Sequence, residues 1–137
     1  MVYLDASALV KLVVPETESA SLKSELARWR EKVTSSIALT EVMRACRGAA
    51  ASGLDPGVIE ALVGEAQALL EGVVMLDADP PLLREAGLLD PIGMRALDAI
   101  HLATALSVAQ ELGALITYDQ RLAAAARAQG LEVLSPN

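Results

Sequence analysis

The sequence contains few of the residues that stack on bases, form disulfides or build thiolate metal sites. Among 137 residues it has no phenylalanine, one tryptophan, two tyrosines, one histidine and one cysteine, Cys46. A single cysteine excludes an internal disulfide and a thiolate metal cluster, and in an apolar helix it is typical of a small buried hydrophobic residue. So few aromatic side chains provide little stacking surface for single-stranded bases.

The sequence also lacks long apolar runs and an excess of positive charge. No uncharged apolar stretch approaches the roughly 18 residues of a membrane span, and the start Met1-Val2-Tyr3-Leu4-Asp5 lacks the basic segment and cleavage site of a signal peptide. We therefore expect a cytoplasmic protein. Eleven Lys and Arg against 18 Asp and Glu give a formal net charge of −7, so any polyanionic substrate must be bound locally and not by bulk charge.

The composition is that of a folded chain. Apolar residues make up 53% of the sequence and charged residues 21%, which is enough apolar material for a sizeable core. No repeat, low-complexity tract or linker interrupts the sequence, and the length fits one domain. We expect residues 1–137 to form a single domain.

Short apolar runs alternate with segments whose apolar residues recur at helical spacing. The predicted strands are 2–4, 33–36, 73–76, 114–118 and 131–134. The predicted helices are 6–14, 22–32, 37–51, 56–70, 80–88, 95–112 and 119–129. Wholly apolar strands that alternate with helices indicate a parallel sheet covered on both faces, so the predicted fold is an α/β three-layer sandwich. In such folds the functional site lies at the carboxyl ends of the strands.

Four acidic residues occur where this architecture places a site. Asp5 ends the first strand, Asp119 follows the strand that ends at Tyr118, and Glu41 and Asp98 lie near helix starts in apolar surroundings. A carboxylate in apolar surroundings is costly unless it is paired or binds a cation, so acids that gather favour a hard metal, Mg²⁺ or Mn²⁺. Each acid alone is also explained as a helix cap, an explanation that fits Asp98 least because it lies inside its helix.

Two hydroxyl residues and the only histidine accompany these acids. Ser7 lies near Asp5 and Thr117 near Asp119. Their hydroxyls either hydrogen-bond a carboxylate or a metal-bound water, or they cap a helix. His101 lies three residues after Asp98. It is interpreted as a packed residue, with a role as proton shuttle as the alternative.

Four blocks of sequence occur in a characteristic order. They are Tyr3-Leu4-Asp5-Ala6-Ser7-Ala8-Leu9-Val10-Lys11, Thr40-Glu41-Val42, Leu97-Asp98-Ala99-Ile100-His101-Leu102-Ala103-Thr104-Ala105, and Leu115-Ile116-Thr117-Tyr118-Asp119-Gln120-Arg121-Leu122. Together they resemble the PIN-domain ribonucleases and, within that family, the toxin subunits of VapBC toxin–antitoxin modules, over nearly the whole chain. The resemblance implies a five-stranded parallel sheet flanked by helices, and a metal site at which these residues converge: Asp5, Glu41, Asp98 and Asp119, supported by Ser7 and Thr117.

The resemblance further implies the activity of an endoribonuclease that depends on Mg²⁺, or on Mn²⁺. Water activated by one or two metal ions would cleave an RNA phosphodiester bond without a covalent intermediate. Five basic residues near the acids are then candidates for contacts with RNA phosphates, or else neutralise carboxylates or lie solvated: Lys11, Arg44, Arg47, Arg95 and Arg121.

Partner proteins are also implied by the resemblance. It implies a toxin homodimer and a cognate VapB-like antitoxin, in a heterotetramer or a larger assembly, with the carboxy-terminal segment of the antitoxin lying near the acids and inhibiting the toxin. The net charge of −7 agrees with a basic partner segment. The apolar residues Leu9, Leu12, Val13 and Trp29 are interpreted either as a partner surface or as ordinary core packing.

Two other function classes are open to this sequence. One is a PIN-fold module that binds metal without turnover. The other is a phosphatase that forms an aspartyl phosphate, which uses Asp-x-Asp after the first strand, whereas this chain has Asp5-Ala6-Ser7 and no Lys after the later strands. A phospho-receiver also needs two neighbouring acids there, and the later pair Asp77 and Asp79 is interpreted as capping the next helix.

Overall fold

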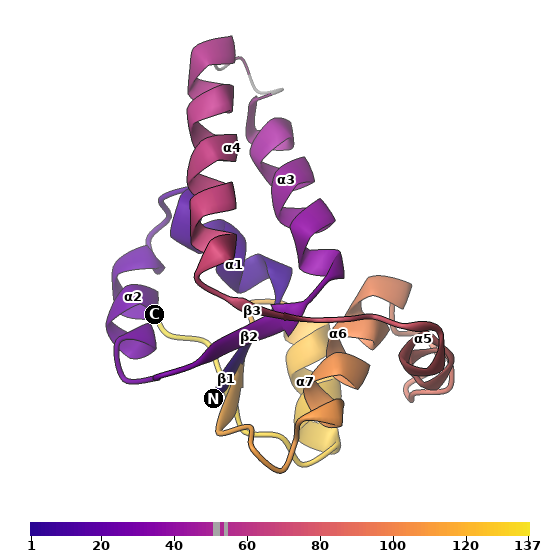
Figure 1. Cartoon of the computed structure of the whole chain (residues 1–137). Coiled ribbons are helices and arrows are strands. Elements are labelled where there is room, and N and C mark those ends of the chain that lie inside the picture. Colours follow the sequence, from indigo (N-terminus) through magenta and orange to yellow (C-terminus); the bar gives the residue numbers. More distant parts are fainter. Residues whose placement is uncertain (51–52, 54) are drawn as a thin grey trace.

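The computed structural model describes residues 1–50, 53 and 55–137. Five parallel strands form one sheet in the spatial order β3-β2-β1-β4-β5 (Figure 1). The strands are β1 (Val2–Leu4), β2 (Lys32–Ser35), β3 (Val74–Leu76), β4 (Ala114–Ile116) and β5 (Val133–Leu134). The predicted five-stranded parallel sheet is confirmed.

The first strand of the chain lies at the centre of the sheet. Val2 is paired with Lys32 of β2 on one side and with Ala114 of β4 on the other. The chain order therefore reverses at β1, and the carboxyl ends of β1 and β4 diverge into helices at the same edge. A reversal of this kind opens a crevice at the carboxyl ends of the strands, where α/β proteins bind their ligands.

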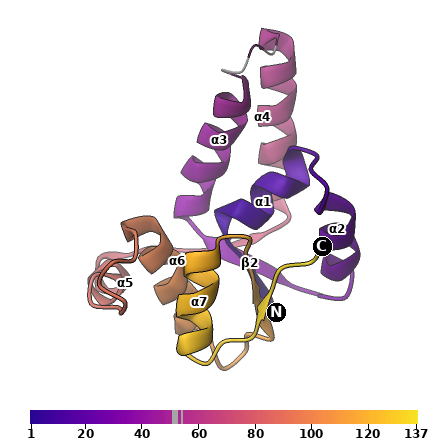
Figure 2. The ribbon, with the colours of Figure 1, turned by 180° about the vertical axis from the view of Figure 1, so that it is seen from behind.

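Helices cover both faces of the sheet (Figures 1 and 2). In the described residues they are α1 (Ala6–Val13), α2 (Ser19–Leu26), α3 (Ile37–Ala50), α4 (Pro56–Glu71), α5 (Pro80–Ala86), α6 (Ala96–Ser107) and α7 (Gln120–Ala128). Helices α3 and α4 lie side by side and extend away from the sheet, while α5 packs on α6 (Figure 1). None of the helices in the described ranges has the length and apolar character that a membrane crossing requires.

The alternation of side chains along the short strands builds two separate cores. Val2 and Leu4 of β1 point to one face, where they pack with residues of α1, α3 and α4. Tyr3 points to the other face and packs with Leu102 of α6 and Leu122 of α7. Because both faces are covered, every residue of β1 is buried, which explains why this strand carries no charged residue.

Helix α2 ends at Leu26 and not at residue 32, so the predicted boundary is wrong. Apolar residues continue at helical spacing to Trp29, but this side chain packs against the backbone at Gly113, where an added Cβ would lie only 2.3 Å from the indole ring. Lys32 already belongs to β2. Trp29 therefore lies after the end of α2, and its side chain packs against Gly113 although its spacing in the sequence is helical.

Helix α6 ends at Ser107, earlier than the predicted residue 112. The Ser107 hydroxyl donates to the carbonyl of Thr104 at 2.7 Å in the last turn. The chain then turns so that the Gly113 amide donates to the Met1 carbonyl at 2.9 Å, which aligns β4 with β1. Helix α2 begins at Ser19, three residues before the predicted start, and the remaining boundaries agree with the prediction within two residues. Residue 51, the predicted end of the helix that begins at Ile37, lies outside the described residues.

Four apolar residues interpreted as either a partner surface or core packing lie in or against the core: Leu9, Leu12, Val13 and Trp29. Leu9 and Val13 are 0% and 4% exposed. Leu12 and Trp29 are partly buried against the same core. Cys46 is also fully buried, as predicted. Core packing is therefore the correct interpretation for these residues.

Candidate active site

Asp5 stands where β1 ends and α1 begins. Its carboxylate caps α1 by accepting from the Ala8 amide at 3.0 Å, and it also accepts from the Ser7 hydroxyl at 2.7 Å and the Thr117 hydroxyl at 2.6 Å. Burial raises the pKa of Asp5, while the hydrogen bonds from Thr117, Ser7 and Ala8 act in the opposite direction. A carboxylate that is only 4% exposed is thus held by three protein donors.

Ser7 and Thr117 join the ends of the two central strands. The Tyr118 amide donates to the Ser7 hydroxyl at 2.9 Å, and the Asp119 amide donates to the Thr117 hydroxyl at 3.0 Å. Both hydroxyls therefore accept from the backbone after β4 while they donate to Asp5 at the end of β1. The structure places both predicted supporting residues next to the acid.

Asp98 lies in the first turn of α6 and carries an unsatisfied oxygen. Its Oδ2 is buried and has no hydrogen-bond partner among the described residues. Loss of solvent raises the pKa of Asp98, the negative charge of Asp119 raises it further, and Arg95 and His101 oppose the rise. The charge on Asp98 is therefore poorly compensated by the protein itself.

Asp119 is the N-cap of α7. Its Oδ1 accepts from the amides of Arg121 at 2.7 Å and Leu122 at 3.1 Å. The capping role considered from the sequence is thus real, but its charge also acts on Asp98. The cap uses only Oδ1, so the second carboxylate oxygen of Asp119 is not engaged in capping α7.

Glu41, on α3, is hydrogen-bonded to the histidine of α6. Glu41 Oε2 lies 2.7 Å from His101 Nε2, and His101 Nδ1 lies 2.7 Å from the Tyr3 hydroxyl. Tyr3 and His101 are both buried, and burial raises the pKa of Tyr3. The predicted packing of His101 is observed, but its contact with a candidate site acid was not anticipated from the sequence.

All four acids line one open cavity of about 310 Å³. Its lining contains Asp5, Ala6, Ser7, Glu41, Arg95, Ala96, Leu97, Asp98, His101 and Asp119. The cavity lies at the edge where β1 and β4 end, as the parallel topology requires. Residues separated by more than a hundred positions in the sequence therefore share one site.

A sequence model of the PIN domain matches residues 2–128. The chain belongs to the PIN-domain family. It is 41% identical over 136 residues to Ribonuclease VapC46 of Mycobacterium tuberculosis, and the match covers 99% of this chain and 98% of that protein. The resemblance to the VapC branch of PIN domains, expected from the four sequence blocks, is confirmed.

Solved structures share the fold of this PIN domain. VapC20 of Mycobacterium tuberculosis, described as a sarcin-ricin loop cleaving toxin, aligns with a TM-score of 0.72 at 16% identity, over 99% of this chain and 100% of VapC20. A toxin–antitoxin complex from Klebsiella pneumoniae aligns with a TM-score of 0.71 at 19% identity, over 100% of this chain and 98% of that one. The predicted sandwich is therefore a PIN-domain fold.

The side chains of the cavity suit a divalent cation in their chemistry. Carboxylate oxygens are the ligands that Mg²⁺ and Mn²⁺ prefer, and the unpartnered Oδ2 of Asp98 is an oxygen that a cation can satisfy. As they stand, no three His, Cys, Asp or Glu side chains of the described residues are grouped closely enough to hold an ion. Both oxygens of Asp5 already accept hydrogen bonds from protein donors.

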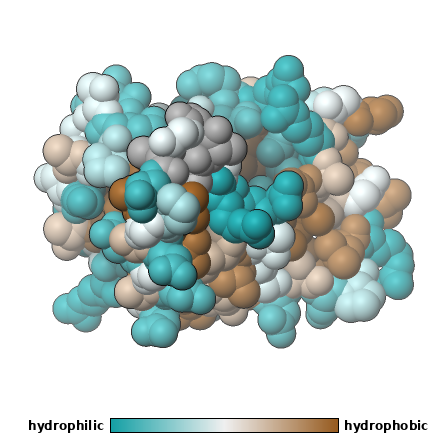
Figure 3. Space-filling view, turned by 90° about the horizontal axis from the view of Figure 1, so that it is seen from above, coloured by the Kyte–Doolittle hydropathy of each residue, from teal (hydrophilic) through white to brown (hydrophobic). Residues whose placement is uncertain are grey.

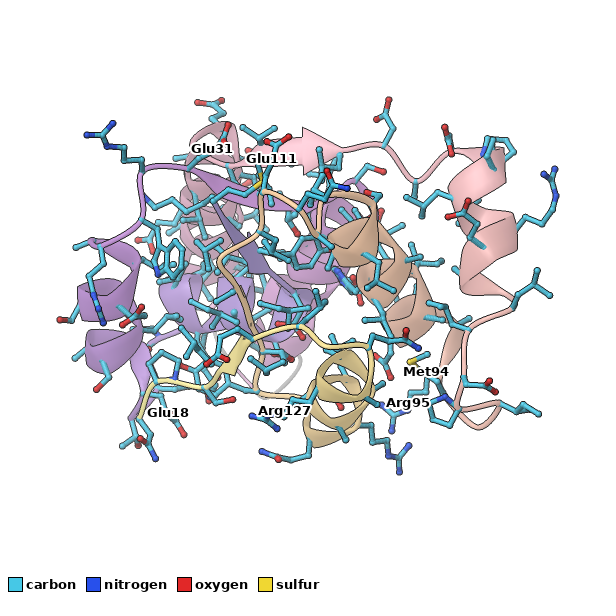
Figure 4. The ribbon with its side chains drawn as sticks, turned by 90° about the horizontal axis from the view of Figure 1, so that it is seen from below. Glu18, Glu31, Met94, Arg95, Glu111 and Arg127 are labelled. Atoms are coloured by element: carbon cyan, nitrogen blue, oxygen red, sulfur yellow. The ribbon has the colours of Figure 1, made fainter. Side chains whose placement is uncertain are left out.

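The predicted RNA-binding residues of this PIN domain lie in different surroundings. Arg95 lines the acid cavity and lies beside α7 at the start of α6 (Figure 4). Lys11 forms ion pairs with Glu16 and Glu18, the second at 3.1 Å. The cavity of the acids therefore holds one of the five predicted basic residues in its lining.

The other three predicted basic residues are exposed. Arg44 and Arg47 border a hollow of about 250 Å³ on α3, the helix of Glu41. The surface seen from above, over α3 and α4, carries many hydrophilic side chains (Figure 3). Arg121 lines a separate groove between α7 and the loop before α6. Their exposure leaves all three available to a large substrate.

The phosphatase alternative does not fit this PIN domain. The second residue after Asp5 is Ser7, which donates to Asp5 and adds no second carboxylate. The cavity lining contains no lysine. Asp79 caps α5 by accepting from the Leu82 amide at 2.9 Å, as predicted, whereas Asp77 precedes the cap and is exposed.

Proposed function

We propose that this chain is a metal-dependent endoribonuclease and the toxin of a type II toxin–antitoxin system. The observation that carries the proposal is the single cavity lined by Asp5, Glu41, Asp98 and Asp119, in which one oxygen of Asp98 is buried without a partner. The relationship to Ribonuclease VapC46, at 41% identity over nearly the full length of both chains, supports RNA as the substrate.

The four carboxylates are the residues that would hold Mg²⁺, or Mn²⁺ in its place. Burial raises the pKa of Asp98 and the negative charge of Asp119 raises it further, and a bound cation would offset both effects. A bound metal would supply a lower pKa for its water, polarisation of the scissile phosphate and stabilisation of the leaving oxygen. The expected products carry a 5′ phosphate.

The other residues of the cavity orient these acids and the substrate. Ser7 and Thr117 fix the Asp5 carboxylate through their hydroxyls. Arg95, at the rim beside Asp98, supplies a positive charge for an RNA phosphate. Arg44 and Arg47 extend this positive charge along α3. Local cations thus bind a polyanion on a chain whose net charge is −7.

The partner part of the proposal is a cognate antitoxin and a homodimeric toxin acting in the cytoplasm. The Klebsiella pneumoniae neighbour was solved as a toxin–antitoxin complex, which supports an antitoxin partner. The net charge of −7 favours a basic inhibitory segment. If a neighbouring reading frame encodes a small protein, its co-expression with this chain should yield a complex that no longer cuts RNA. Light scattering of the free chain should give twice the mass of 14.3 kDa. Separate purification of the two proteins would contradict the antitoxin partner, and a monomer mass would contradict the homodimer.

The catalytic part is tested by incubating the protein with total RNA in Mg²⁺, in Mn²⁺ and in EDTA. Discrete fragments with 5′ phosphates are expected in metal, and intact RNA in EDTA. Asp98→Asn keeps the shape of the side chain and removes its charge, so cleavage should fall by at least about 100-fold. The matched control is Asp79→Asn. Asp79 lies outside the cavity and caps α5, and asparagine caps a helix equally well, so this variant should cleave RNA at the wild-type rate. Metal binding without cleavage would instead identify a PIN-fold module that has no turnover.

A further inference from the structure

A buried chain of hydrogen bonds connects Tyr3, His101 and Glu41. The Tyr3 hydroxyl lies 2.7 Å from His101 Nδ1, and His101 Nε2 lies 2.7 Å from Glu41 Oε2. The two rings meet edge to face, with centroids 5.9 Å apart and planes at 80°. The His101 side chain is 3% exposed and that of Glu41 is 22% exposed, so the chain runs from the core to the wall of the cavity.

The direction of these bonds follows from the donors and acceptors. A carboxylate only accepts, so His101 Nε2 must carry the proton that binds Glu41. In the neutral imidazole with that proton on Nε2, Nδ1 accepts from the Tyr3 hydroxyl. Each group holds the next one in a single orientation, which is the arrangement found where an outer residue orients a metal ligand.

The chain also ties together three elements that carry candidate acids. Tyr3 lies two residues before Asp5 on β1, and His101 lies one helical turn after Asp98 on α6. Glu41 comes from a third element, α3. Apolar side chains would also fill this space, because a hydrogen bond contributes only modestly to net stability. The polar chain therefore adds an orientation to these three side chains that apolar packing would not give.

We propose that His101, held by Tyr3, is a positioning residue that fixes Glu41 Oε2 and leaves Oε1 for a divalent cation. This inference rests on the proposed metal-dependent function. Neither Tyr3 nor His101 touches the substrate; both act through Glu41. Loss of outer-shell hydrogen bonds typically weakens metal binding by about 10- to 100-fold.

The test is a calorimetric titration with Mn²⁺ of the wild-type chain and four variants. Tyr3→Phe removes only the hydroxyl and should weaken Mn²⁺ binding by about 10-fold. His101→Leu should weaken it more, and His101→Gln should restore part of the affinity, because the glutamine amide still donates to Glu41. Tyr118→Phe is the matched control: it also loses one hydroxyl bond, to the Pro136 carbonyl, but lies outside the cavity lining, so its Mn²⁺ affinity should stay within about twofold of the wild type.

A double variant separates positioning from a general loss of structure. If Tyr3 acts only through Glu41, Tyr3→Phe combined with Glu41→Gln should bind Mn²⁺ as weakly as Glu41→Gln alone. A further loss in the double variant would overturn the inference, as would wild-type affinity in Tyr3→Phe. If His101→Leu fails to fold, the Tyr3→Phe pair still decides the question. Absence of Mn²⁺ binding by the wild-type chain would overturn the proposed function as well.

Discussion

Removal of the Asp98 charge should have opposite effects on stability in the absence and in the presence of metal. In the metal-free protein, Asp98 Oδ2 is buried without a partner and the charge of Asp119 acts against it. An unsatisfied buried polar group costs about 1–3 kcal/mol. The lower end applies here, because the residue is partly exposed and asparagine retains a polar atom at the same place.

Asp98→Asn should therefore be about 1 kcal/mol more stable than the wild type in EDTA, which corresponds to a Tm about 3 °C higher for a chain of this size. In Mn²⁺ the order should reverse. A cation at 100 times its dissociation constant stabilises the wild type by about 2.7 kcal/mol, whereas the variant has lost one of the predicted ligands. Metal binding thus compensates a charge that destabilises the metal-free fold.

The assay is thermal unfolding of the wild type, Asp98→Asn and Asp79→Asn, each in EDTA and in saturating Mn²⁺. Asp79 caps α5 and lies outside the cavity, so its variant should follow the wild type in both conditions. A lower Tm for Asp98→Asn in EDTA would show that the protein compensates this charge. An equal gain from Mn²⁺ in the wild type and in Asp98→Asn would show that Asp98 is not a ligand.

Three further predictions concern pH, core packing and the support of Asp5. Because the pKa of Asp98 is raised in the folded state, its ionisation destabilises the metal-free protein, and Tm should fall as pH rises above the ordinary carboxyl value of 3.8. Asp98→Asn should reduce this fall in Tm, and parallel Tm–pH curves for the two proteins would contradict the prediction. Gly113→Ala places a Cβ 2.3 Å from the Trp29 ring and should cost about 1–3 kcal/mol, measured by urea unfolding followed by tryptophan fluorescence; an unchanged midpoint would be inconsistent with this contact. Thr117→Val removes the 2.6 Å hydrogen bond to buried Asp5 and should lower the free energy of unfolding by about 1–3 kcal/mol in urea, and a variant as stable as the wild type would refute that support.

Much of the fold and of the cavity follows from local sequence patterns. Asp5 and Asp119 each follow an apolar run, and parallel strands bring their carboxyl ends to one edge. Asp98 stands out in the sequence because it lies inside a predicted apolar helix and is not needed as its N-cap. All three line the observed cavity together with Glu41.

The partners of buried polar groups were not predictable in the same way. His101 signalled only that a histidine lay on an apolar helix face, and its contacts with Tyr3 and Glu41 depend on how α6 crosses β1 and α3. Burial of a histidine nevertheless requires hydrogen-bond partners, so the candidates were the few polar residues on the facing elements. Tyr3, in the middle of an otherwise apolar strand, was the available signal.

Long-range packing also explains where pattern reading failed. The helical spacing that ends at Trp29 predicts a longer α2, but the indole packs on Gly113 from outside the helix. Lys11 stays a predicted RNA-contact residue, and the structure adds its ion pairs with Glu16 and Glu18 beyond the end of α1. Gly113, which is distant from Trp29 in the sequence, therefore decides the packing that the helical spacing does not predict.

The central claim is that the cavity of Asp5, Glu41, Asp98 and Asp119 is a metal-dependent ribonuclease site. The most direct test is the initial rate at which an end-labelled RNA is cut, measured against Mn²⁺ concentration for the wild type, Asp98→Asn and Asp79→Asn. We predict a rate that rises with Mn²⁺ and saturates for the wild type and for Asp79→Asn, and that stays near background for Asp98→Asn. Equal rates for the wild type and Asp98→Asn, or cleavage that persists in EDTA, would contradict the claim.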